Sequence, residues 1–297
     1  MKAFITGARG FLGSNLTAYL KTIGIPYVRY DALDGCHLHR WDYLQAAMEE
    51  CDTVFHLAAN ADIQKGWDNP TRDLEVNTIG TSQVLEAMRT MDKKRIIFAS
   101  SSAVYGETVN PKEDCPWPIQ TSLYGASKVA GEALIQAYAE GQGFEAYICR
   151  LSLLLGEGYK HGHVYDFVKQ LETHPEYLTV RGDGKQRKAY IYVKDCISAM
   201  LSLSSEKRTG IWNLVTTESC TIRESIGWIC DEMKVLPVVS YSGGDKGWVG
   251  DAPNLTPSCE KLYATGWRPT VNTEEAIRRT VRSIIKNEQN ECAGFGG

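Results

Sequence analysis

Two residues that could form an acid–base pair stand four positions apart in the segment Tyr124-Gly-Ala-Ser-Lys128. On a helix this spacing places both side chains on one face. An ammonium group beside a phenol stabilises the phenolate and lowers a pKa that is normally about 10. We therefore expect Lys128 to lower the pKa of Tyr124, which then acts as a base toward a sugar or alcohol hydroxyl. Without further context the same spacing indicates only a helix face.

A serine run supplies that context, because Ser100-Ser-Ser-Ala-Val-Tyr-Gly ends a strand that precedes the Tyr124 helix. The Ser101 hydroxyl could hydrogen-bond the Tyr124 oxygen and hold it in line with a substrate hydroxyl. A serine, a tyrosine and a lysine in this order predict hydride chemistry, in which the tyrosine handles the proton while a nicotinamide takes the hydride. The positive charge of the oxidised nicotinamide is expected to add to that of Lys128 in lowering the pKa of Tyr124.

A glycine turn near the start of the chain provides a place for the nicotinamide cofactor. Gly7, Gly10 and Gly13 follow the first apolar run and open the first helical pattern. Glycine permits a sharp turn and a close approach of a pyrophosphate to the helix N-terminus, where free N–H groups and the helix dipole favour negative charge. A tight strand-to-helix turn without a ligand could contain the same glycines.

Asp31 ends the second expected strand, eighteen residues after Gly13. A carboxylate at this place can accept both ribose hydroxyls of NAD and would repel the 2′-phosphate of NADP. The alternative is a plain turn aspartate, such as Asp34. Arg9, in the glycine loop, could assist a phosphate and leaves NADP open.

Two further segments fit a dinucleotide. Asp42, in Trp41-Asp-Tyr, could reach the adenine amino group, or could cap a helix. His56-Leu-Ala-Ala ends the third strand, and the small Ala58 and Ala59 would let the backbone lie close to the cofactor. We expect His56 itself to be structural.

Alternating strand and helix patterns must position these groups. Strands are expected at 2–6, 27–30, 53–57, 95–100 and 145–151, and helices at 11–23, 43–50, 70–91 and 124–140. This alternation predicts a doubly wound α/β fold with a parallel sheet covered by helices on both faces.

The pattern becomes less regular after about residue 155. Helices are expected near 164–172, 195–204, 222–233 and 273–287, with strand-like pieces at 178–180 and 189–193. We therefore predict a dinucleotide-binding domain at 1–155 and a smaller α/β substrate lobe at 156–287, some segments of which return to the first domain. Residues 288–297 are expected to form a loose tail.

Composition narrows the class of protein. The 297 residues are 43% hydrophobic and 23% charged, which is typical of a globular chain. The net charge of −4 argues against a nucleic-acid-binding surface. No apolar run approaches the roughly 20 residues of a membrane span. Nine scattered cysteines without a C-x-x-C pair indicate reduced thiols, no metal site and a cytoplasmic protein.

Taken together, these motifs resemble the extended short-chain dehydrogenase/reductases, specifically the nucleotide-sugar epimerase/dehydratase family. The resemblance covers Lys2 to about Asn287 and is strongest in a short series of segments: Thr6–Gly13, Asp31, Asp42, His56–Ala59, Asn77–Thr81, Ser100–Gly106, Tyr124–Lys128, Arg150–Gly156 and Gly182–Asp195. It implies a Rossmann-type fold, NAD as cofactor, and a nucleoside-diphosphate sugar as substrate.

The resemblance also implies roles for single residues. The pyrophosphate would be bound by backbone groups of the glycine turn, and the remaining cofactor contacts would come from side chains and small residues along the first half: Gly7, Gly10, Phe11, Leu12, Gly13, Asp31, Asp42, Tyr43, Leu57, Ala58, Ala59, Asn77, Tyr124 and Lys128. Tyr124 would be the base, Lys128 would hold the nicotinamide ribose, and Ser101 would complete the catalytic group.

Residues at the substrate are implied less specifically. The stretch Gly182–Val193 resembles the segment that meets the substrate diphosphate, and Lys188 stands where many members have arginine, beside Arg187. A charged hairpin is the alternative. Val164 or Tyr165 would lie against the nucleotide base, and Lys65 and Ser102 would border the sugar.

The family's dehydratases place an Asp-Glu pair directly after the catalytic hydroxyl residue, and its decarboxylases often keep the glutamate. Ser102 and Ala103 occupy those positions here, so proton transfer to carbon lacks its usual acids. We therefore predict C4 epimerisation of a UDP-sugar through a transient 4-keto sugar. The alternatives are an NAD(P)-dependent ketosugar reductase and a non-catalytic NAD-sensing protein on the same fold. A homodimer through the helices at 70–91 and 124–140 is expected from the family.

Overall fold

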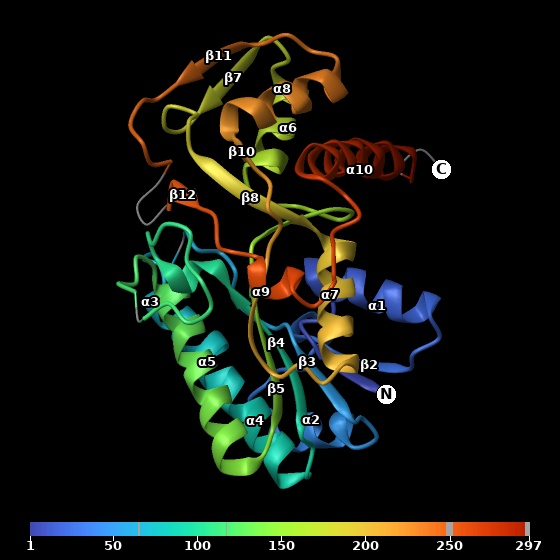
Figure 1. Cartoon of the computed structure of the whole chain (residues 1–297). Coiled ribbons are helices and arrows are strands. Elements are labelled where there is room, and N and C mark those ends of the chain that lie inside the picture. The colour runs from blue at the N-terminus through green and yellow to red at the C-terminus, as the bar shows by residue number, and fades with distance from the viewer. Residues whose placement is uncertain (65, 117, 248–251, 295–297) are drawn as a thin grey trace.

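The central element of the protein is a sheet of six parallel strands in the order β2-β1-β3-β4-β5-β9 (Figure 1). The computed structural model describes residues 1–64, 66–116, 118–247 and 252–294, with side chains as far as Lys286. The strands are β1 (Ala3–Thr6), β2 (Tyr27–Tyr30), β3 (Thr53–His56), β4 (Arg95–Ser101), β5 (Glu145–Leu151) and β9 (Gly210–Leu214). The chain passes from β1 to β2 on one side and then to β3 on the other, so a topological switch point, where such sheets bind ligands, lies between β1 and β3.

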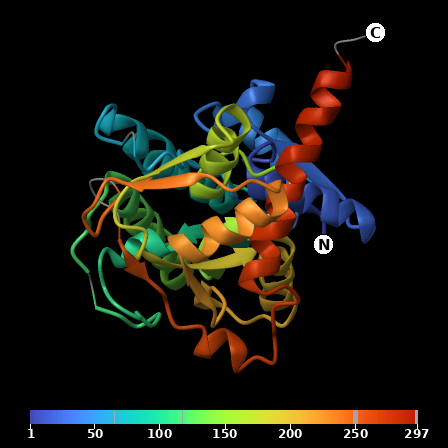
Figure 2. The ribbon, with the colours of Figure 1, turned by 90° about the horizontal axis from the view of Figure 1, so that it is seen from above.

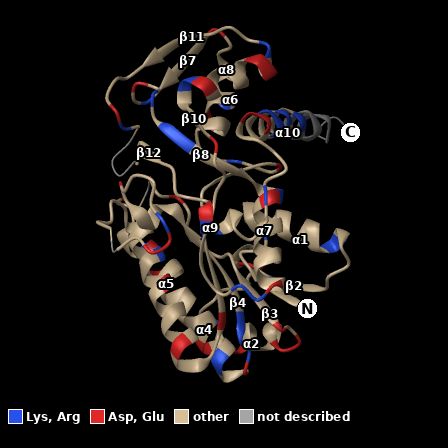
Figure 3. Cartoon of the chain, in the orientation of Figure 1, with Lys and Arg blue, Asp and Glu red and all other residues tan. Residues whose placement is uncertain are grey.

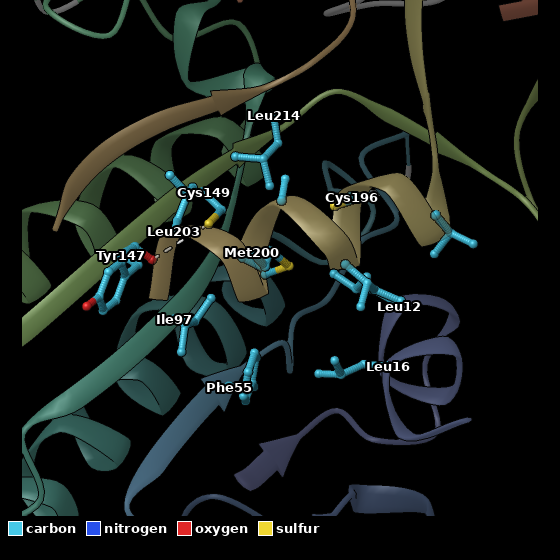
Figure 4. Packing of buried hydrophobic residues seen from close by; sticks show 14 of the residues in the cluster. Leu12, Leu16, Phe55, Ile97, Tyr147, Cys149, Cys196, Met200, Leu203 and Leu214 are labelled. Atoms are coloured by element: carbon cyan, nitrogen blue, oxygen red, sulfur yellow. Dashed lines mark hydrogen bonds between the residues drawn. The ribbon is translucent and has the colours of Figure 1, made fainter. Parts of the chain in front are cut away.

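Helices cover both faces of this sheet because successive strand residues point to opposite sides. Ile5 and Ile97 join a cluster with α1 (Phe11–Thr22) and α7 (Val193–Ser205), which Figure 4 shows from close by. Phe4 and Ile96 join the opposite cluster, with α2 (Trp41–Met48), α4 (Gly80–Thr90) and α5 (Leu123–Gln142). The predicted doubly wound sheet is confirmed.

The helix expected at 70–91 contains a change of winding. It runs as α3 (Pro70–Asp73), a π-helical segment η2 (Leu74–Ile79) and then α4. A π segment widens one turn and is frequent at functional sites. Two short 3₁₀ turns, η1 (Ala32–Asp34) and η3 (Ser102–Tyr105), follow β2 and β4.

A second lobe lies above the carboxyl ends of the sheet strands (Figure 1). Its strand β8 (Arg187–Tyr192) pairs with β6 (Leu153–Leu155), β10 (Ser219–Thr221) and β12 (Asn254–Leu255), and β7 (Tyr177–Val180) pairs with β11 (Val238–Tyr241). A separate apolar cluster joins these strands to α6 (His163–Thr173), α8 (Ile222–Met233) and α10 (Thr273–Gly294). Seen from above, α10 runs past α8 to the C-terminus (Figure 2).

Two segments differ from the expectation. The strand β9 was not predicted, since five residues beginning with glycine carry no local periodicity and pair with β5 only after a long excursion through the second lobe. The tail expected from residue 288 is instead helical to Gly294, because extending an existing helix needs no new nucleation. Residues 295–297 lie outside the described part.

The division of the chain at residue 155 stays a prediction.

The short helix α9 (Glu260–Tyr263) precedes α10. None of the helices in the described ranges is long and apolar enough to cross a membrane.

Candidate active site

The glycine turn leaves an open helix N-terminus beside the switch point. Gly7 has φ +68°, and a Cβ there would lie 2.7 Å from the Ala58 backbone nitrogen. A Cβ at Gly13 would overlap the Gly7 carbonyl oxygen, so only glycine allows α1 to start this close to β1. Gly10 is the N-cap and has no side chain to cover the first N–H groups of the helix. This cradle fits the pyrophosphate of a dinucleotide.

The side chains of Phe11 and Leu12 pack away from that cradle. Leu12 lies in the apolar cluster between α1 and α7, and the Phe11 ring contacts Tyr159 edge-on at 5.6 Å between ring centres. Only their backbone groups can therefore serve a phosphate, as the resemblance implies.

Asp31 joins the end of β2 to the glycine loop. Its carboxylate accepts hydrogen bonds from the backbone N–H of Arg9 at 2.8 Å and of Leu33 at 2.9 Å. Each oxygen keeps a further acceptor site for a ribose hydroxyl. The Arg9 guanidinium is paired with Asp34 at 3.0 Å, so a 2′-phosphate would have to compete with that carboxylate for it. This arrangement fits NAD.

Asp42 and Tyr43 lie exposed in the first turn of α2, with the Arg40 guanidinium 4.1 Å from the centre of the Tyr43 ring. Arg40, not Asp42, is the N-cap residue of α2. The alternative that Asp42 caps the helix is therefore wrong, and its role at the adenine stays a prediction.

The segment after β3 is held by a threonine and a histidine. The N–H groups of Leu57 and Ala58 both donate to Thr6 Oγ1 at 3.2 Å. His56 is buried between Thr6 and Thr81, and burial, aided by the charge of Lys128, lowers its pKa to about 3. His56 is thus a neutral structural bridge that fixes the edge along which Leu57, Ala58 and Ala59 run.

Asn77, in the π-helical segment, holds the next residue along this edge. Its side-chain oxygen accepts from the Asn60 backbone N–H at 2.8 Å, and its amide donates to the Asn60 carbonyl at 3.1 Å and to Ser127 Oγ at 2.9 Å. Asp73, one turn earlier, accepts from the Asn60 side chain at 2.8 Å. Neither Asn60 nor Asp73 was among the predicted site residues; an aspartate four residues before Asn77 on an expected helix was the available signal.

Ser101, Tyr124 and Lys128 come together where β4 ends and α5 begins. The Ser122 side chain caps α5 by accepting from the Gly125 N–H, and a Cβ at Gly125 would lie 2.8 Å from the Ala103 carbonyl oxygen. This close approach of α5 to η3 brings the Ser101 hydroxyl into hydrogen-bonding range of Tyr124.

Tyr124 and Lys128 share one face of α5, with Lys128 Nζ 5.8 Å from the centre of the Tyr124 ring. The Lys128 ammonium donates to the Ala99 carbonyl at 2.8 Å and keeps two further N–H donors. Ser102, the next residue of η3, is nearly buried beside this group.

The pKa of Tyr124 differs from the prediction in the cofactor-free protein. Burial raises it to about 12; the hydrogen bond from Ser101 lowers it, and the charge of Asp73 raises it further. Burial likewise lowers the pKa of Lys128 to about 8, against the attraction of Glu132 and Asp73. Without cofactor, desolvation of the phenolate therefore outweighs the cation at this distance. The expected phenolate, which also depended on the charge of the oxidised nicotinamide, stays a prediction for the NAD-bound protein.

A buried network that the sequence analysis missed supports this face of α5. Glu132, one turn beyond Lys128, pairs with Arg150 at 2.7 Å and accepts a hydrogen bond from Ser100. Arg150 also donates to the Tyr105 hydroxyl at 2.8 Å, which donates to Asn213 Oδ1 at 2.7 Å. Strands β4, β5 and β9 are thereby tied to the helix that carries the acid–base pair.

The predicted substrate residues are only partly brought together. Basic residues begin β8 (Figure 3), but neighbouring strand residues point to opposite faces. Arg187 donates to the Ser219 carbonyl at 2.8 Å and lies 4.0 Å from Glu224, whereas Lys188 donates to the Ala252 carbonyl at 2.7 Å. The expectation that both serve one diphosphate is therefore wrong. Lys188, which is half-buried and stands where many family members have arginine, remains the candidate for the diphosphate contact.

The predicted contacts to the nucleotide base need a similar correction. Val164 is fully buried in the apolar cluster of the second lobe, so it exposes no surface to a ligand. Tyr165 is half-buried beside Lys169, with Nζ 5.3 Å from its ring centre. Lys65 lies outside the described residues.

The comparisons with known proteins agree with this geometry. Residues 3–214 match the family model "NAD dependent epimerase/dehydratase family". The chain is 28% identical to a putative UDP-glucose 4-epimerase of Methanocaldococcus jannaschii over 96% of its length and 99% of the relative, and 25% identical to the dTDP-D-glucose 4,6-dehydratase of Mus musculus over 97% and 90%. A crystal structure of the Thermus thermophilus UDP-glucose 4-epimerase in complex with NAD superposes with a TM-score of 0.84, covering 96% of this chain and 99% of that one at 28% identity.

The names of these relatives describe different reactions, an epimerisation and a dehydration, and the Thermus thermophilus structure holds NAD. The glycine cradle and the remaining acceptor sites of Asp31 fit that cofactor. The chain is a member of the NAD-dependent epimerase/dehydratase family, a Rossmann-type nucleotide-sugar enzyme that uses NAD.

Proposed function

We propose that this enzyme epimerises C4 of a nucleoside-diphosphate sugar, with a UDP-sugar as substrate. The proposal rests on the residues that form the turn after β4. Ser101 lies beside Tyr124, and the next two positions, Ser102 and Ala103, hold no carboxylate. The group at this turn can move a proton on oxygen but lacks the acids that dehydration requires at carbon.

The residues of the chain have distinct tasks in this reaction. Tyr124, hydrogen-bonded by Ser101, takes the proton of the 4-hydroxyl group and later returns it to the same oxygen. Lys128 offers its two remaining N–H donors to the nicotinamide ribose, and its charge favours the phenolate. NAD⁺, when bound, would supply the acceptor for the C4 hydride and the means of returning it. Return of the hydride to the opposite face of the rotated 4-keto sugar inverts C4, so substrate and product differ only in configuration.

The raised pKa of Tyr124 in the cofactor-free protein gives the cofactor a second task. The positive charge of the oxidised nicotinamide adds to that of Lys128 and opposes the effect of burial. Tyr124 would thus become a base chiefly when NAD⁺ is in place. This restricts deprotonation of the sugar to the state that can accept its hydride.

UDP is proposed as the nucleotide because the relatives with 28% identity bear the name UDP-glucose 4-epimerase. Lys188 is proposed as the diphosphate contact from the second lobe. Tyr165 is the remaining candidate at the base. A homodimer through the helix α3–α4 and α5, and a cytoplasmic location, stay predictions.

The test is incubation of the purified protein with NAD⁺ and a panel of UDP-, GDP- and dTDP-sugars, including N-acetyl and uronic acid forms. We expect a C4 epimer of one UDP-sugar to form with no net change in NADH, and none to form with Tyr124→Phe. In a parallel assay with NADH and a nucleoside-diphosphate 4-ketosugar, stoichiometric oxidation of NADH would instead identify a ketosugar reductase. Absence of turnover with the whole panel, with NAD still bound, would favour the sensing protein.

A further inference from the structure

Asp73 is a buried carboxylate, and only one of its two oxygens accepts hydrogen bonds from the described part of the chain. The residue is 1% exposed, and Oδ1 accepts from the Asn60 side chain at 2.8 Å and from Asn77 Nδ2 at 3.5 Å. Oδ2 is also buried and has no hydrogen-bond partner among the described residues. A buried charge with an unused acceptor is costly, and its retention requires a compensating role.

This carboxylate lies on the side of the site where the nicotinamide is expected. Asn60, which it holds, directly follows the Ala58-Ala59 edge, and Asn77 connects the same cluster to Ser127, the neighbour of Lys128 on α5. Oδ2 is closed off by the turn at Gly66, where an added Cβ would come within 3.2 Å of it. The charge is therefore fixed in place and shielded from water.

The known tasks of the site do not explain this charge. It raises the pKa of Tyr124, which hinders formation of the phenolate, and it raises the pKa of Lys128, which keeps that ammonium charged. Both effects have one sign: Asp73 favours positive charge and disfavours negative charge in its surroundings. The oxidised nicotinamide carries a positive charge that the reduced form has lost.

We propose that Asp73 is a fixed counter-charge that makes this site bind NAD⁺ in preference to NADH. In a reaction that removes and returns a hydride, such a bias favours return of the hydride to the sugar and prevents the enzyme from being left in the reduced form. Asp73 is a positioning residue for charge and touches neither the substrate nor the reacting atoms. The inference rests on NAD binding and not on C4 epimerisation.

The experiment measures the dissociation constants of NAD⁺ and NADH by calorimetry, without any sugar, for the wild type and for Asp73→Asn. Asparagine retains the Oδ1 acceptor and the shape of the side chain but removes the charge. We expect the ratio of the NAD⁺ constant to the NADH constant to rise about tenfold, which is the order of magnitude for the loss of one buried charge near an opposite charge. Asp68→Asn removes the same charge from an exposed position just before α3 and should leave the ratio within twofold of the wild type.

The proposal is overturned if Asp73→Asn folds and its ratio of NAD⁺ to NADH dissociation constants stays within twofold of the wild type. This holds even if both dissociation constants increase by the same factor, because the role of Asp73 would then be structural. Should Asp73→Asn fail to fold, Asp73→Ser removes the charge while keeping an acceptor, and the same rise in the ratio is expected. Asn60→Ala leaves the carboxylate in place and should change both constants by the same factor. Since no sugar is present, failure of the proposed epimerase activity would not affect the result.

Discussion

The ammonium of Lys128 lies 5.8 Å from the ring centre of Tyr124, on the same face of α5, and burial moves the pKa values of both groups toward their neutral forms. In the cofactor-free protein, Tyr124 is thus an uncharged phenol, and it lies beside the Lys128 amine, whose pKa is about 8. The charge states of Tyr124 and Lys128 therefore depend on what surrounds them. Their shifted pKa values can be measured through the pH dependence of the free energy of unfolding.

The first prediction concerns Lys128→Met. The folded-state pKa of Lys128, about 8, lies below its ordinary value of 10.5, so between these pH values the unfolded chain binds more protons and stability rises with pH. We expect the free energy of unfolding of the cofactor-free wild type to increase relative to Lys128→Met by about 2–3 kcal/mol from pH 7.5 to pH 10.5. Urea unfolding at both pH values measures this difference. Lys21→Met, which removes an exposed lysine, should show no such change, and a pH-independent difference for Lys128→Met would contradict the buried charge.

The second prediction concerns Tyr124→Phe. Removing the hydroxyl takes away the group that moves the substrate proton, and epimerase turnover should fall about 10³-fold. The affinity for NAD⁺ should change little, because the cradle and Asp31 are untouched. Ser122→Ala, which removes the cap of α5 without touching the pair, should cost about 1 kcal/mol of stability and leave most of the activity. Retention of more than a tenth of the wild-type rate in Tyr124→Phe would exclude this residue as the base.

The third prediction concerns Gly13→Ala. A Cβ at this position overlaps the Gly7 carbonyl oxygen, so α1 must move away from β1 and the cradle must open. We expect the affinity for NAD⁺ to fall more than tenfold and the free energy of unfolding to fall by about 1–3 kcal/mol. Gly227→Ala is the matched control, since its Cβ meets open space in α8 and alanine should stabilise that helix by roughly 0.5–1 kcal/mol. Normal NAD⁺ binding by Gly13→Ala would show that the turn can relax without loss of the site.

The fourth prediction concerns Glu132→Gln. Its ion pair with Arg150 is almost fully buried, and loss of one partner leaves an uncompensated charge. We expect the free energy of unfolding to fall by about 3 kcal/mol, measured by denaturant unfolding. Glu260→Gln breaks the exposed pair with Lys112 and should cost less than about 1 kcal/mol. Equal effects of the two substitutions would mean that the buried network does not stabilise α5.

Much of the site could be predicted because its determinants are local. The turn around Gly7 and Gly13, and the spacing of Tyr124 and Lys128, depend on backbone geometry within one strand-to-helix connection or one helix. Asp31 could be recognised by its distance from the same turn. These features need no knowledge of what packs against them.

The remaining features depend on segments that are distant in sequence. Arg187 and Lys188 are adjacent in the chain, yet the pairing of β8 with β10 and β12 assigns them to different neighbours. Val164 was expected at the nucleotide base, but α8 and α10 pack against its helix and bury it. The strand β9 exists only because β5 offers it a free edge.

Short stretches of the chain are thus enough to specify the α/β fold, the glycine turn at the start of α1 and the position of Tyr124 and Lys128 on one helix face, because helix periodicity and glycine conformation are local properties. The charge state of that pair, and the presence of Asp73 and Glu132 beside it, became visible only in the folded molecule. Burial and long-range electrostatics are set by groups that fold against a residue, and they shift a pKa in ways that spacing along the chain does not reveal.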